Sequence, residues 1–413
     1  MKIWIINQYN MPPEYGHLNR HYNFGKYLKL NGCEPTVFVG SFLHNTSFQM
    51  IKDGSIIKEY RGAGYPYYFI KTCNYSKSKL KRVYAMFEFY KNLIKAVKSF
   101  DKPDIILGSS AHPLAAIAAI KLGEKYCCQS IVEVRDLWPE SLVAYGIVNK
   151  SNPLLRLLYA GEKWIYKNAD KLIFTMEGAK DYIVNQGWDI GHGGPIDLNK
   201  VYHVNNGVDL DEYDKNVKST PYQDSDLDNT EIFKVVYAGS IRKANNLELI
   251  INAAKYIQEN YRENIKFFIF GDGDEKEKLQ QKCKVEMINN VIFKGQVEKK
   301  YIPHILSKSD LNILNYSYHK IWEYGGSQNK NFEYLASGKP ILSTIRMGYD
   351  IIERYNAGIS LQSQTIKSIG EAIISIARMD ESKYAELSRN ARKAAIDYDF
   401  KLLTEKLINI IED

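Results

Sequence analysis

The sequence predicts an α/β protein made of two domains, each built on a parallel β-sheet, and three observations lead to this prediction. Short β-branched and aromatic runs alternate with helical patterns along the whole chain, as in βαβ units. The 413 residues exceed the length at which one hydrophobic core stops growing, roughly 250–300 residues. An acidic segment interrupts the alternation once. We therefore expect domains at residues 1–208 and 231–413, joined by a linker at 209–230.

The first domain is expected to form a sheet whose strands are separated by helices. The runs that predict strands are 2–7, 35–39, 68–71, 105–108, 131–135, 171–175 and 202–204. Helical patterns lie at 17–30, 80–100, 113–127, 152–168 and 177–186. The strand runs are almost continuously apolar, which is typical of parallel strands covered by helices on both faces.

The linker and the second domain follow. Residues 209–231 hold eight acids and two lysines and show no apolar period. Strands are then predicted at 233–238, 265–270, 291–293, 311–314, 340–343 and 358–361, and closing helices at 366–377, 382–395 and 400–411. We expect the last helix to pack back on the first domain. Ligands of open parallel sheets bind beyond the carboxyl ends of the strands, which predicts a site between two facing sheets.

Composition excludes several classes of protein. Apolar residues make up 45% of the chain and charged residues 25%, as in ordinary globular proteins. The five cysteines form no C-x-x-C pair, which argues against a disulfide scaffold or a zinc ribbon. The chain starts without an apolar region of signal-peptide length, and its longest uncharged stretch, 105–120, is too short to span a bilayer. We expect a cytoplasmic protein.

Positive charge is concentrated in residues 71–100, which carry eight basic residues and one acid, Glu88. Apolar residues recur there at helical spacing: Leu80, Val83, Tyr84, Phe87, Tyr90, Leu93 and Ile94. This pattern fits a helix that packs on its own domain with its lysines in water. It also fits a helix that lies on an anionic membrane, and one helix can do both.

Two nucleotide-binding motifs are absent. Gly271-Asp-Gly273 follows a predicted strand but lacks the third glycine of a dinucleotide fingerprint, and acids surround it. A tight strand-to-helix turn explains it better. Gly338-Lys339 is followed by Pro340 and is not part of a phosphate-binding loop of the Walker type.

The segment 323–342 predicts an anion site. Gly325 and Gly326 form a turn, and Ser327 is a natural N-cap for a helix that ends near Gly338. The first turn of this helix presents free backbone N–H groups and the positive end of the dipole. Lys330 adds a full positive charge there.

Two further groups extend this anion site. Asn329 and Glu333 share a face of the helix, where a carboxylate can accept two hydrogen bonds from a ribose diol; a solvated Glu333 is the alternative. Gly239 ends the strand 233–238 and brings Arg242 and Lys243 to the same edge of the sheet. Together with the helix these cations make a diphosphate clamp, whereas scattered surface bases are the alternative.

These residues belong to a set of motifs by which the chain resembles a known family, the retaining GT-B glycosyltransferases of family 4. The motifs are Pro12-Pro-Glu-Tyr-Gly16, Glu133-Val-Arg-Asp-Leu-Trp-Pro-Glu-Ser141, Asn206-Gly-Val-Asp209, Gly271-Asp-Gly273 and the segment from Gly325 to Glu333. The Arg-Asp-Leu-Trp-Pro-Glu-Ser string is similar to that of bacterial O-antigen and capsule N-acetyl-L-fucosaminyl transferases.

The resemblance implies a GT-B fold, in which two Rossmann-like domains face each other across a cleft and the second binds a UDP-sugar. It identifies Glu333 with the second glutamate of the E-x7-E motif, which holds the ribose. Gly325 stands where the first glutamate of the motif is expected, and Glu323 lies two residues earlier. We expect Ser327 to Lys330 to take over the role of the missing first glutamate. Gly16 matches the family's first-domain glycine, which the resemblance places among the residues that bind the nucleotide sugar, and His17 follows it.

The resemblance also implies a mechanism that retains the anomeric configuration. Arg242, Lys243, Lys330 and the helix dipole would stabilise the leaving diphosphate, so we expect no metal or other cofactor. Asp209-Leu-Asp211 and Asp272-Gly-Asp274 have metal-motif spacing but are explained as linker and turn.

In the first domain, Arg135 and Asp136 follow a strand and are expected to orient the acceptor hydroxyl. Asp136 could instead cap the turn before Trp138-Pro139. His112 and His17 are further candidates on the acceptor side.

The expected function is transfer of an N-acetylated or deoxy sugar from a UDP-sugar to a saccharide on a polyprenyl diphosphate, in bacterial O-antigen or capsule synthesis. The enzyme would bind the cytoplasmic face of the inner membrane through residues 71–100, and no nucleic-acid partner is expected. Two alternatives remain: a UDP-sugar 2-epimerase of similar architecture and a non-catalytic nucleotide-sugar-binding protein.

Overall fold

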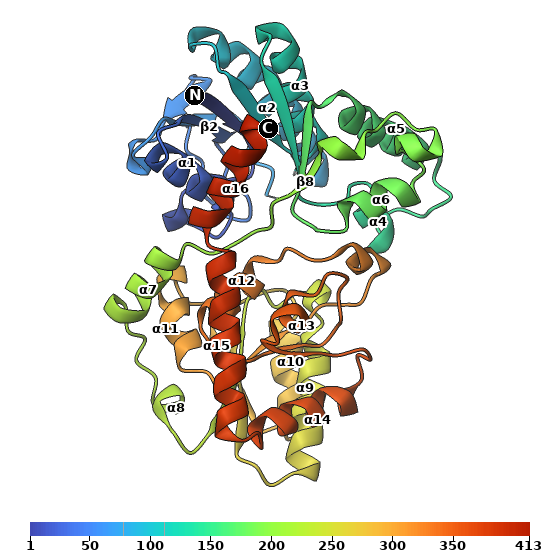
Figure 1. Ribbon diagram of the computed structural model, residues 1–413. Helices are drawn as coiled ribbons and strands as arrows, with labels where there is room; N and C mark the ends of the chain where they lie inside the picture. The colour runs from blue at the N-terminus through green and yellow to red at the C-terminus, as the bar shows by residue number, and fades with distance from the viewer. Residues whose placement is uncertain (77, 111) are drawn as a thin grey trace. The chain divides into compact units, whose positions relative to one another are not determined.

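The computed structural model spans residues 1–413 and describes all of them except Lys77 and Ala111. It contains two compact units, Met1–Asn205 with Leu403–Asp413, and Asn206–Leu402. Each unit is a parallel sheet with helices packed on it (Figure 1). This confirms the α/β prediction. Among the described residues, no helix combines the length and the apolar character needed to cross a bilayer.

The first unit is built on an eight-stranded sheet in the order β3-β4-β2-β1-β5-β6-β7-β8. The strands are β1 Lys2–Ile6, β2 Glu34–Gly40, β3 Ile57–Glu59, β4 Tyr67–Ile70, β5 Ile105–Ser109, β6 Gln129–Val134, β7 Lys171–Phe174 and β8 Val201–His203. All pairs are parallel except β3 with β4. The sequence predicts every strand but β3, whose three edge residues are too few to show an alternation.

Helices cover both faces of this sheet. They are α1 Arg20–Leu30, α2 Lys79–Ala96, α3 Pro113–Tyr126, α4 Glu140–Ala144, α5 Pro153–Asn168, α6 Ala179–Asn185 and α16 Phe400–Glu412. On one face Trp4, Ile6 and Phe38 pack against Phe89 of α2 and Ala119 of α3. The short helix α4 was not expected, because five residues give no helical period.

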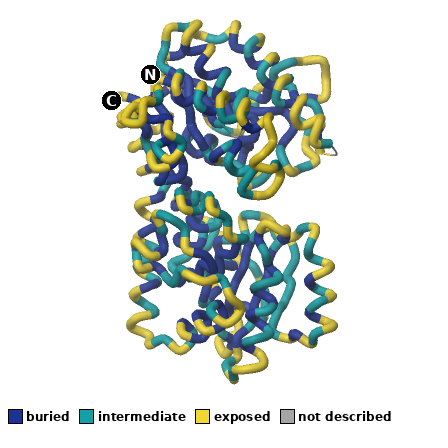
Figure 2. The backbone as a smooth tube through the Cα atoms, turned by 90° about the vertical axis from the view of Figure 1, so that its right-hand side faces the viewer, coloured by how far each residue is buried: buried dark blue, intermediate teal, exposed yellow. Residues whose placement is uncertain are grey.

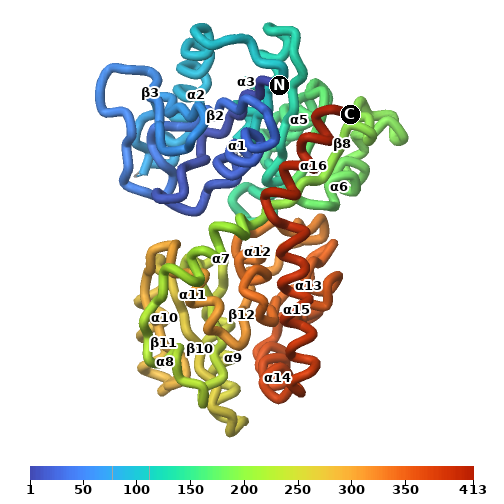
Figure 3. The backbone as a smooth tube through the Cα atoms, turned by 60° about the vertical axis from the view of Figure 1, so that its left-hand side comes forward, coloured from blue at the N-terminus to red at the C-terminus, as the bar shows by residue number. Residues whose placement is uncertain are grey.

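The second unit is built on a six-stranded sheet, all parallel, in the order β11-β10-β9-β12-β13-β14. Its strands are β9 Phe233–Ala238, β10 Ile265–Phe270, β11 Val291–Gly295, β12 Leu311–Leu314, β13 Ile341–Ser343 and β14 Gly358–Ser360. Its helices are α7 Leu210–Ser219, α8 Ser225–Asp228, α9 Leu247–Asn260, α10 Lys276–Val285, α11 Ile302–Ser307, α12 Asn329–Ala336, α13 Ile351–Tyr355, α14 Ile366–Ala377 and α15 Glu381–Asp397. Within this unit α15 packs along α12 and α13, and α14 along α9 (Figure 3).

The segment 209–230, expected to be a linker, is folded and belongs to the second unit. It forms α7 and α8, and Leu210, Tyr213 and Leu227 are buried. Asp209 caps α7 by accepting a hydrogen bond from the Glu212 backbone N–H at 3.1 Å. The prediction of a linker was wrong because so few apolar residues, widely spaced among acids, show no period.

In both sheets the chain reverses its direction of travel beside the first strand of the unit. In the first sheet this point lies between β1 and β5, and in the second between β9 and β12. Loops that leave neighbouring strands at such a point diverge and open a crevice. The central strands of both sheets are buried, and Figure 2 shows buried backbone, in dark blue, inside each unit. The chemistry is therefore expected in the residues just after these strands.

Candidate functional site

In the second unit, the turn after β9 is built by close backbone contact with the turn after β10. Gly239 N–H donates to Phe270 O at 2.9 Å, and Ile241 N–H donates to Asp272 O at 2.8 Å. A Cβ at Gly271, where φ is +141°, would lie 1.8 Å from Gly239 O. The Gly271-Asp-Gly273 motif is therefore a packing turn, as expected, and Asp272 pairs with Lys276 at 3.3 Å.

Lys330, in the first turn of α12, lies directly against this glycine turn. Its Nζ donates to Tyr237 Oη at 2.8 Å, and it lies 4.5 Å from the centroid of the Tyr237 ring and 5.1 Å from that of Tyr316. A Cβ at Gly239 would meet Lys330 Cε at 2.5 Å. Gly239 is thus required for the lysine to approach the carboxyl end of β9.

Burial decides the charge of Lys330. Desolvation lowers the pKa of Lys330 from 10.5 to about 7, and the carboxylate of Glu333 opposes this only in part. No carboxylate among the described residues lies within ion-pair distance of its ammonium group. The ammonium group of Lys330 is therefore partly buried among aromatic rings and the Tyr237 hydroxyl, surroundings in which an added negative charge would stabilise the protonated form.

Side-chain hydrogen bonds hold the turn that follows Gly239. Tyr237 Oη donates to Ser240 O at 2.8 Å, and Asn245 Nδ2 donates to the same carbonyl at 2.7 Å. Asn315, which follows β12, donates a hydrogen bond from its Nδ2 to Asn245 O at 2.6 Å. The switch-point loops from β9 and β12 are therefore tied together.

Arg242 and Lys243 are the exposed cations of this turn. Arg242 precedes the short 3-10 helix Lys243–Asn245, and both side chains are exposed. Neither makes an ion pair with any residue that the structure describes. Both follow the carboxyl end of β9, which is where the sequence predicts them.

The start of α12 differs from the expectation. The N-cap residue is Gln328 and its side chain does not cap the helix, so the assignment of Ser327 as N-cap was wrong. Ser327 Oγ instead accepts from the Asn206 backbone N–H at 3.0 Å, and Ser327 O accepts from Asn206 Nδ2 at 2.7 Å. The Asn206-Gly-Val-Asp209 motif thus positions the segment that leads into α12. The helix ends as expected, at Gly338 with φ +63°.

Glu333 lies one turn after Asn329 on α12 and is partly buried. Lys299 Nζ, from the segment after β11, lies 3.8 Å from Glu333 Oε1. Tyr213 of α7 is close to it: burial first, and then the charge of Glu333, raise the pKa of the Tyr213 hydroxyl. The carboxylate remains accessible enough to accept hydrogen bonds from a diol.

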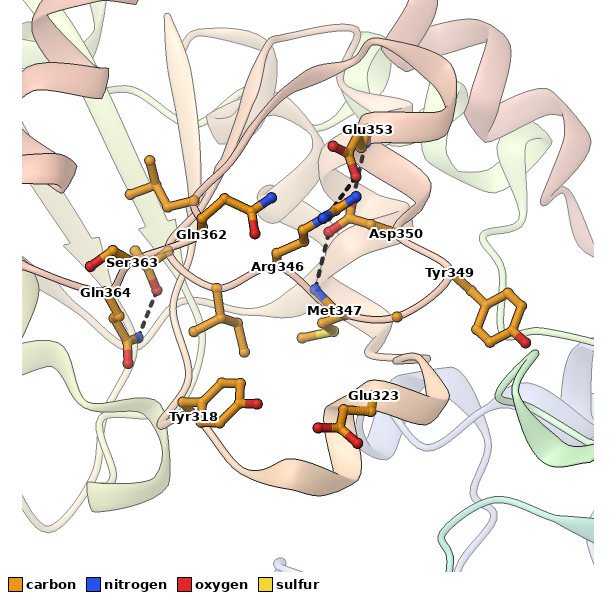
Figure 4. A pocket seen from close by; sticks show the side chains of 14 residues that line it. Tyr318, Glu323, Arg346, Met347, Tyr349, Asp350, Glu353, Gln362, Ser363 and Gln364 are labelled. Carbon is orange, nitrogen blue, oxygen red and sulfur yellow. Dashed lines mark hydrogen bonds and ion pairs between the residues drawn. The ribbon is translucent and has the colours of Figure 1, made fainter. Parts of the chain in front are cut away.

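A separate cavity of about 690 Å³ lies in the same unit, beside the ends of β13 and β14 (Figure 4). Tyr318, Glu323, Arg346, Met347, Gln362 and Gln364 are among its lining residues. Arg346 Nε pairs with Glu353 Oε2 at 2.8 Å on its wall. Glu323 lines this cavity, whereas neither Glu333 nor Lys330 does.

In the first unit, a buried charge network joins the ends of several strands. Glu133 of β6 accepts from Arg20 Nε at 2.7 Å, and its other oxygen lies 2.9 Å from His21 Nε2. Ser109, the last residue of β5, donates to Glu133 at 3.0 Å, and Asn7, after β1, donates to His21 Nδ1 at 2.8 Å. The Arg20 guanidinium also donates to Val204 O at 2.8 Å, after β8.

The protonation states within this network follow from its contacts. Burial raises the pKa of Glu133, but the positive charge of Arg20, the hydrogen bond from His21 and the charge of Arg135 outweigh it and hold the pKa well below its usual value. Burial lowers the pKa of His21 despite the nearby carboxylate. The network therefore contains an ionised Glu133, a charged Arg20 and a neutral His21 with its proton on Nε2.

Of the sequence-predicted residues of the first unit, Arg135 lies near this network. Arg135 is half-buried and acts electrostatically on Glu133, and Asp136 is exposed, with no hydrogen bond to its side chain from any described residue. Gly16 follows the short turn Pro13–Tyr15, and His17 is exposed.

His112 is buried beside Tyr9, with ring centroids 5.5 Å apart, and desolvation followed by Arg82 lowers its pKa to about 3. Both ring nitrogens of His112 lack a hydrogen-bond partner among the described residues, as do the side-chain N and O of the buried Gln8. Because β1 and β5 are neighbours, these unpartnered groups follow the two strands at the switch point.

Several site residues were missed from the sequence. Arg20, His21 and Glu133 form the buried network, and Tyr237 and Lys299 contact the predicted anion-binding residues. A glutamate within the apolar run 131–134 was a usable signal, because a lone acid in a buried strand requires a cationic partner.

Comparison with known proteins gives matches to both halves of the chain. A family model described as Glycosyltransferase Family 4 matches residues 19–212, and one described as Glycosyl transferases group 1 matches residues 221–394. An uncharacterized glycosyltransferase of Methanocaldococcus jannaschii is 23% identical over 261 residues, which cover 60% of this chain and 61% of the relative. The alignment thus spans less than two thirds of that relative's length.

Solved structures match over nearly all of the chain. Sucrose-phosphate synthase of Thermosynechococcus elongatus aligns with a TM-score of 0.74 and 15% identity, covering 100% of this chain and 98% of the other. HepE of Anabaena in complex with UDP aligns with a TM-score of 0.69 and 15% identity, covering 100% of both chains. These likenesses confirm the GT-B fold.

Proposed function

Because the chain belongs to the GT-B glycosyltransferases, with group 1 and family 4-like halves, we propose that it is a retaining glycosyltransferase that uses a UDP-sugar. Its product is a lengthened saccharide on a polyprenyl diphosphate, in bacterial O-antigen or capsule synthesis. The transferred sugar is of the N-acetylated or deoxy kind, as the Arg-Asp-Leu-Trp-Pro-Glu-Ser string of N-acetylfucosaminyl transferases suggests.

The observation that carries the proposal is the position of Lys330. A partly buried lysine reaches the carboxyl end of β9 against Gly239. Glu333 lies one turn further along α12, and two exposed cations, Arg242 and Lys243, follow Gly239 in the chain. Three positive groups at a switch point match a diphosphate, and a carboxylate beside them matches a ribose diol. UDP as the nucleotide is supported by HepE of Anabaena, which binds UDP and UDP-glucose in its solved structures.

The proposed mechanism stabilises the leaving group. Negative charge develops on the diphosphate as the glycosidic bond breaks, and Arg242, Lys243, Lys330 and the α12 dipole neutralise it without a metal ion. The acceptor hydroxyl attacks from the same face as the leaving group, which retains the configuration. We assign Arg135 and Asp136 to its orientation, and His112 and His17 to the acceptor side.

The acceptor and the location are part of the proposal. A saccharide on a polyprenyl diphosphate stays at the membrane, so the enzyme works at the cytoplasmic face of the inner membrane. Two alternatives, a UDP-sugar 2-epimerase and a non-catalytic binding protein, are not favoured, because both family models describe glycosyl transferases. Exchange of solvent deuterium into the donor sugar without an acceptor would identify the epimerase.

A screen of nucleotide sugars tests the proposal directly. UDP-, GDP- and dTDP-sugars are added separately, and the midpoint of thermal unfolding is measured, because a ligand that binds only the folded state stabilises it. We expect UDP-sugars to give the largest shift. Transfer is then assayed with lipid-linked saccharides. A protein that is stabilised by none of these donors would contradict the proposal.

Glu333→Gln should weaken UDP binding, because an amide cannot accept two hydrogen bonds from the ribose as a carboxylate does. The loss should be about 1.5–3 kcal/mol, the range for hydrogen bonds to charged groups. Isothermal titration with UDP measures it. Glu371→Gln, an exposed glutamate of α14, is the matched control and should bind like the parent. Equal affinity of Glu333→Gln and the parent would remove Glu333 from the site.

Arg242→Ala and Lys243→Ala should each lower kcat/KM by about 10²–10³, as for loss of one preformed stabiliser of developing charge. Lys367→Ala, an exposed lysine of α14, is the control and should retain parent activity. EDTA should leave the parent active. If EDTA abolishes transfer and Mg²⁺ or Mn²⁺ restores it, the metal-free mechanism is wrong.

A further inference from the structure

Helix α2 has an inner face that packs and an outer face that does not. Phe89, Leu93 and Ala96 are buried and join the core of the first unit, and Ala85 is buried against Tyr9 and Phe42. The apolar stripe that the sequence shows from Leu80 to Ile94 therefore has two parts, one exposed to solvent and one packed on the core. Packing on its own domain accounts for the second half of the helix and not for the first.

The outer face carries four large apolar side chains in water. Leu80 is 83% exposed, Val83 49%, Tyr84 61% and Phe87 58%. Their spacing of three and four residues places them on one side of the helix, opposite the buried side chains. No other helix exposes so many large apolar side chains, counting the residues that the structure describes. A contiguous apolar patch of this kind marks a contact surface.

Basic residues surround this apolar ridge, defined here as Leu80, Val83, Tyr84 and Phe87. Exposed lysines border it: Lys79, Lys81, Lys91 and Lys95. Arg82 instead lies on the inner side, with its guanidinium 5.3 Å from the centroid of the Tyr9 ring. The only acid of the helix, Glu88, accepts a hydrogen bond from the Cys73 backbone N–H at 2.6 Å. Lys77, which the sequence places in the same segment, is outside the described residues.

We infer that the apolar ridge of α2 enters the headgroup boundary of an anionic lipid bilayer, while the surrounding lysines bind the lipid phosphates. The helix is labelled in Figures 1 and 3. An apolar face framed by lysines fits this surface better than a protein partner, because leucine, valine and aromatic side chains take the acyl boundary and cations take the headgroups. The inference rests on the proposed function for its biological reason, a lipid-linked acceptor, and it assigns the larger share of binding to apolar insertion.

Vesicle binding separates insertion from simple charge attraction. The full chain is sedimented with vesicles of phosphatidylcholine containing about a third phosphatidylglycerol, at about 0.1 M and about 1 M salt, across which the Debye length falls from ~10 Å to ~3 Å. The parent should bind at both salt concentrations. The variant Leu80→Ser, Val83→Ser, Tyr84→Ser, Phe87→Ser should bind on the order of 100-fold more weakly at both, because it loses the apolar contribution.

A charge variant and a surface control complete the experiment. Lys79→Glu, Lys81→Glu, Lys91→Glu should weaken binding at low salt and much less at high salt. Leu30→Ser with Val285→Ser removes two side chains that are 71% and 70% exposed and should bind vesicles like the parent. Thermal unfolding of each variant confirms that it is folded.

Three outcomes would overturn the inference: a parent that does not bind vesicles, a parent whose binding disappears at high salt, or a serine variant that binds as the parent does. Capture of the ridge by a protein partner without vesicle binding would do the same. The test needs no catalysis, so it stands even if the chain transfers no sugar. If the chain does transfer sugar, the rate of transfer to a water-soluble acceptor should be equal in the parent and the serine variant.

Discussion

We predict that donor binding depends on pH through Lys330. Its pKa in the ligand-free protein is lowered to about 7 by burial, so at neutral pH about half of the molecules carry the charge. A bound diphosphate favours the ammonium form and raises this pKa, and binding therefore takes up a proton. Affinity should be highest below pH 7 and fall, by up to about tenfold per pH unit, as the pH rises above 7.

Titration with UDP-glucose between pH 6 and pH 9, without an acceptor, measures this dependence. The sugar diphosphate is preferable to UDP, whose terminal phosphate itself titrates near pH 6. Lys330→Met should bind more weakly and with little pH dependence, and Lys330→Arg should keep a charge throughout. A parent whose affinity is constant over this range would show that Lys330 does not contact the diphosphate.

At the residue scale, the sequence predicts contacts between residues that are close in the chain and misses contacts between residues that are far apart in it. Lys330 and Glu333 share one helix with the glycines that precede it, so their grouping can be read from spacing. Ser327 was misassigned because its hydroxyl is taken by Asn206, 121 residues away. The Arg20–Glu133 pair joins residues 113 positions apart, and only the strand order brings them together.

The turns after β9 and β10 work as one element, which a glycine substitution can test. Gly271→Ala would place a Cβ against Gly239 O. Because this oxygen belongs to the backbone, it cannot rotate away from the Cβ as a side-chain atom could. We expect a loss of about 1–3 kcal/mol in the free energy of unfolding and weaker UDP-sugar binding, because the Gly239 turn moves relative to Lys330.

Gly338→Ala is the matched control for this prediction. Gly338 also has a positive φ, +63°, but its Cβ would meet nothing closer than 3.8 Å. It should lose about 1 kcal/mol of stability through backbone strain alone and keep its affinity for the donor. Unfolding midpoints and titrations of both variants measure the difference. Equal affinity losses in the two would disprove the coupling of the turns.

Elements were predicted well where the pattern is long. Strands buried on both faces appear as apolar runs, and every central strand of both sheets lies within a residue or two of its expected position. The exceptions, β3, α4 and α8, have three to five residues each, too few to show a period. In α7 the acidic residues outnumber the two buried apolar residues, Leu210 and Tyr213. The composition is therefore typical of a linker, and the helix was not predicted.

At the scale of the whole molecule, the chain ends in the unit where it began. Residues Leu403–Asp413 of α16 belong to the first unit, and Leu403, Leu407, Ile410 and Ile411 are buried. The buried Lys171 of β7 donates to Ile410 O at 2.6 Å and Ile411 O at 3.3 Å. The last helix was expected to pack back on the first domain, although its apolar stripe by itself does not say which sheet it covers.

Deleting residues 403–413 should therefore unfold the first unit and spare the second. The deletion removes four buried side chains, each worth about 1.5–3 kcal/mol, and leaves the Lys171 ammonium group without its acceptors. The sum approaches the 5–15 kcal/mol that stabilises a typical domain. Limited proteolysis with mass spectrometry should show rapid cleavage within 1–205. The charged groups proposed to bind the donor, Arg242, Lys243, Lys330 and Glu333, lie in Asn206–Leu402, so titration with UDP-sugar should still detect binding.

A shorter deletion controls for the loss of chain as such. Removing only Glu412 and Asp413 gives up one exposed side-chain hydrogen bond, from Tyr202 Oη to Asp413 at 2.6 Å, besides backbone bonds at the helix end, and should leave the proteolysis pattern unchanged. Lys171→Met separates the two contributions, because it keeps the apolar contacts of α16 and removes the buried charge. If the full deletion leaves 1–205 as resistant as in the parent, α16 is dispensable to the first unit. If donor binding is lost together with that unit, the second unit does not fold by itself.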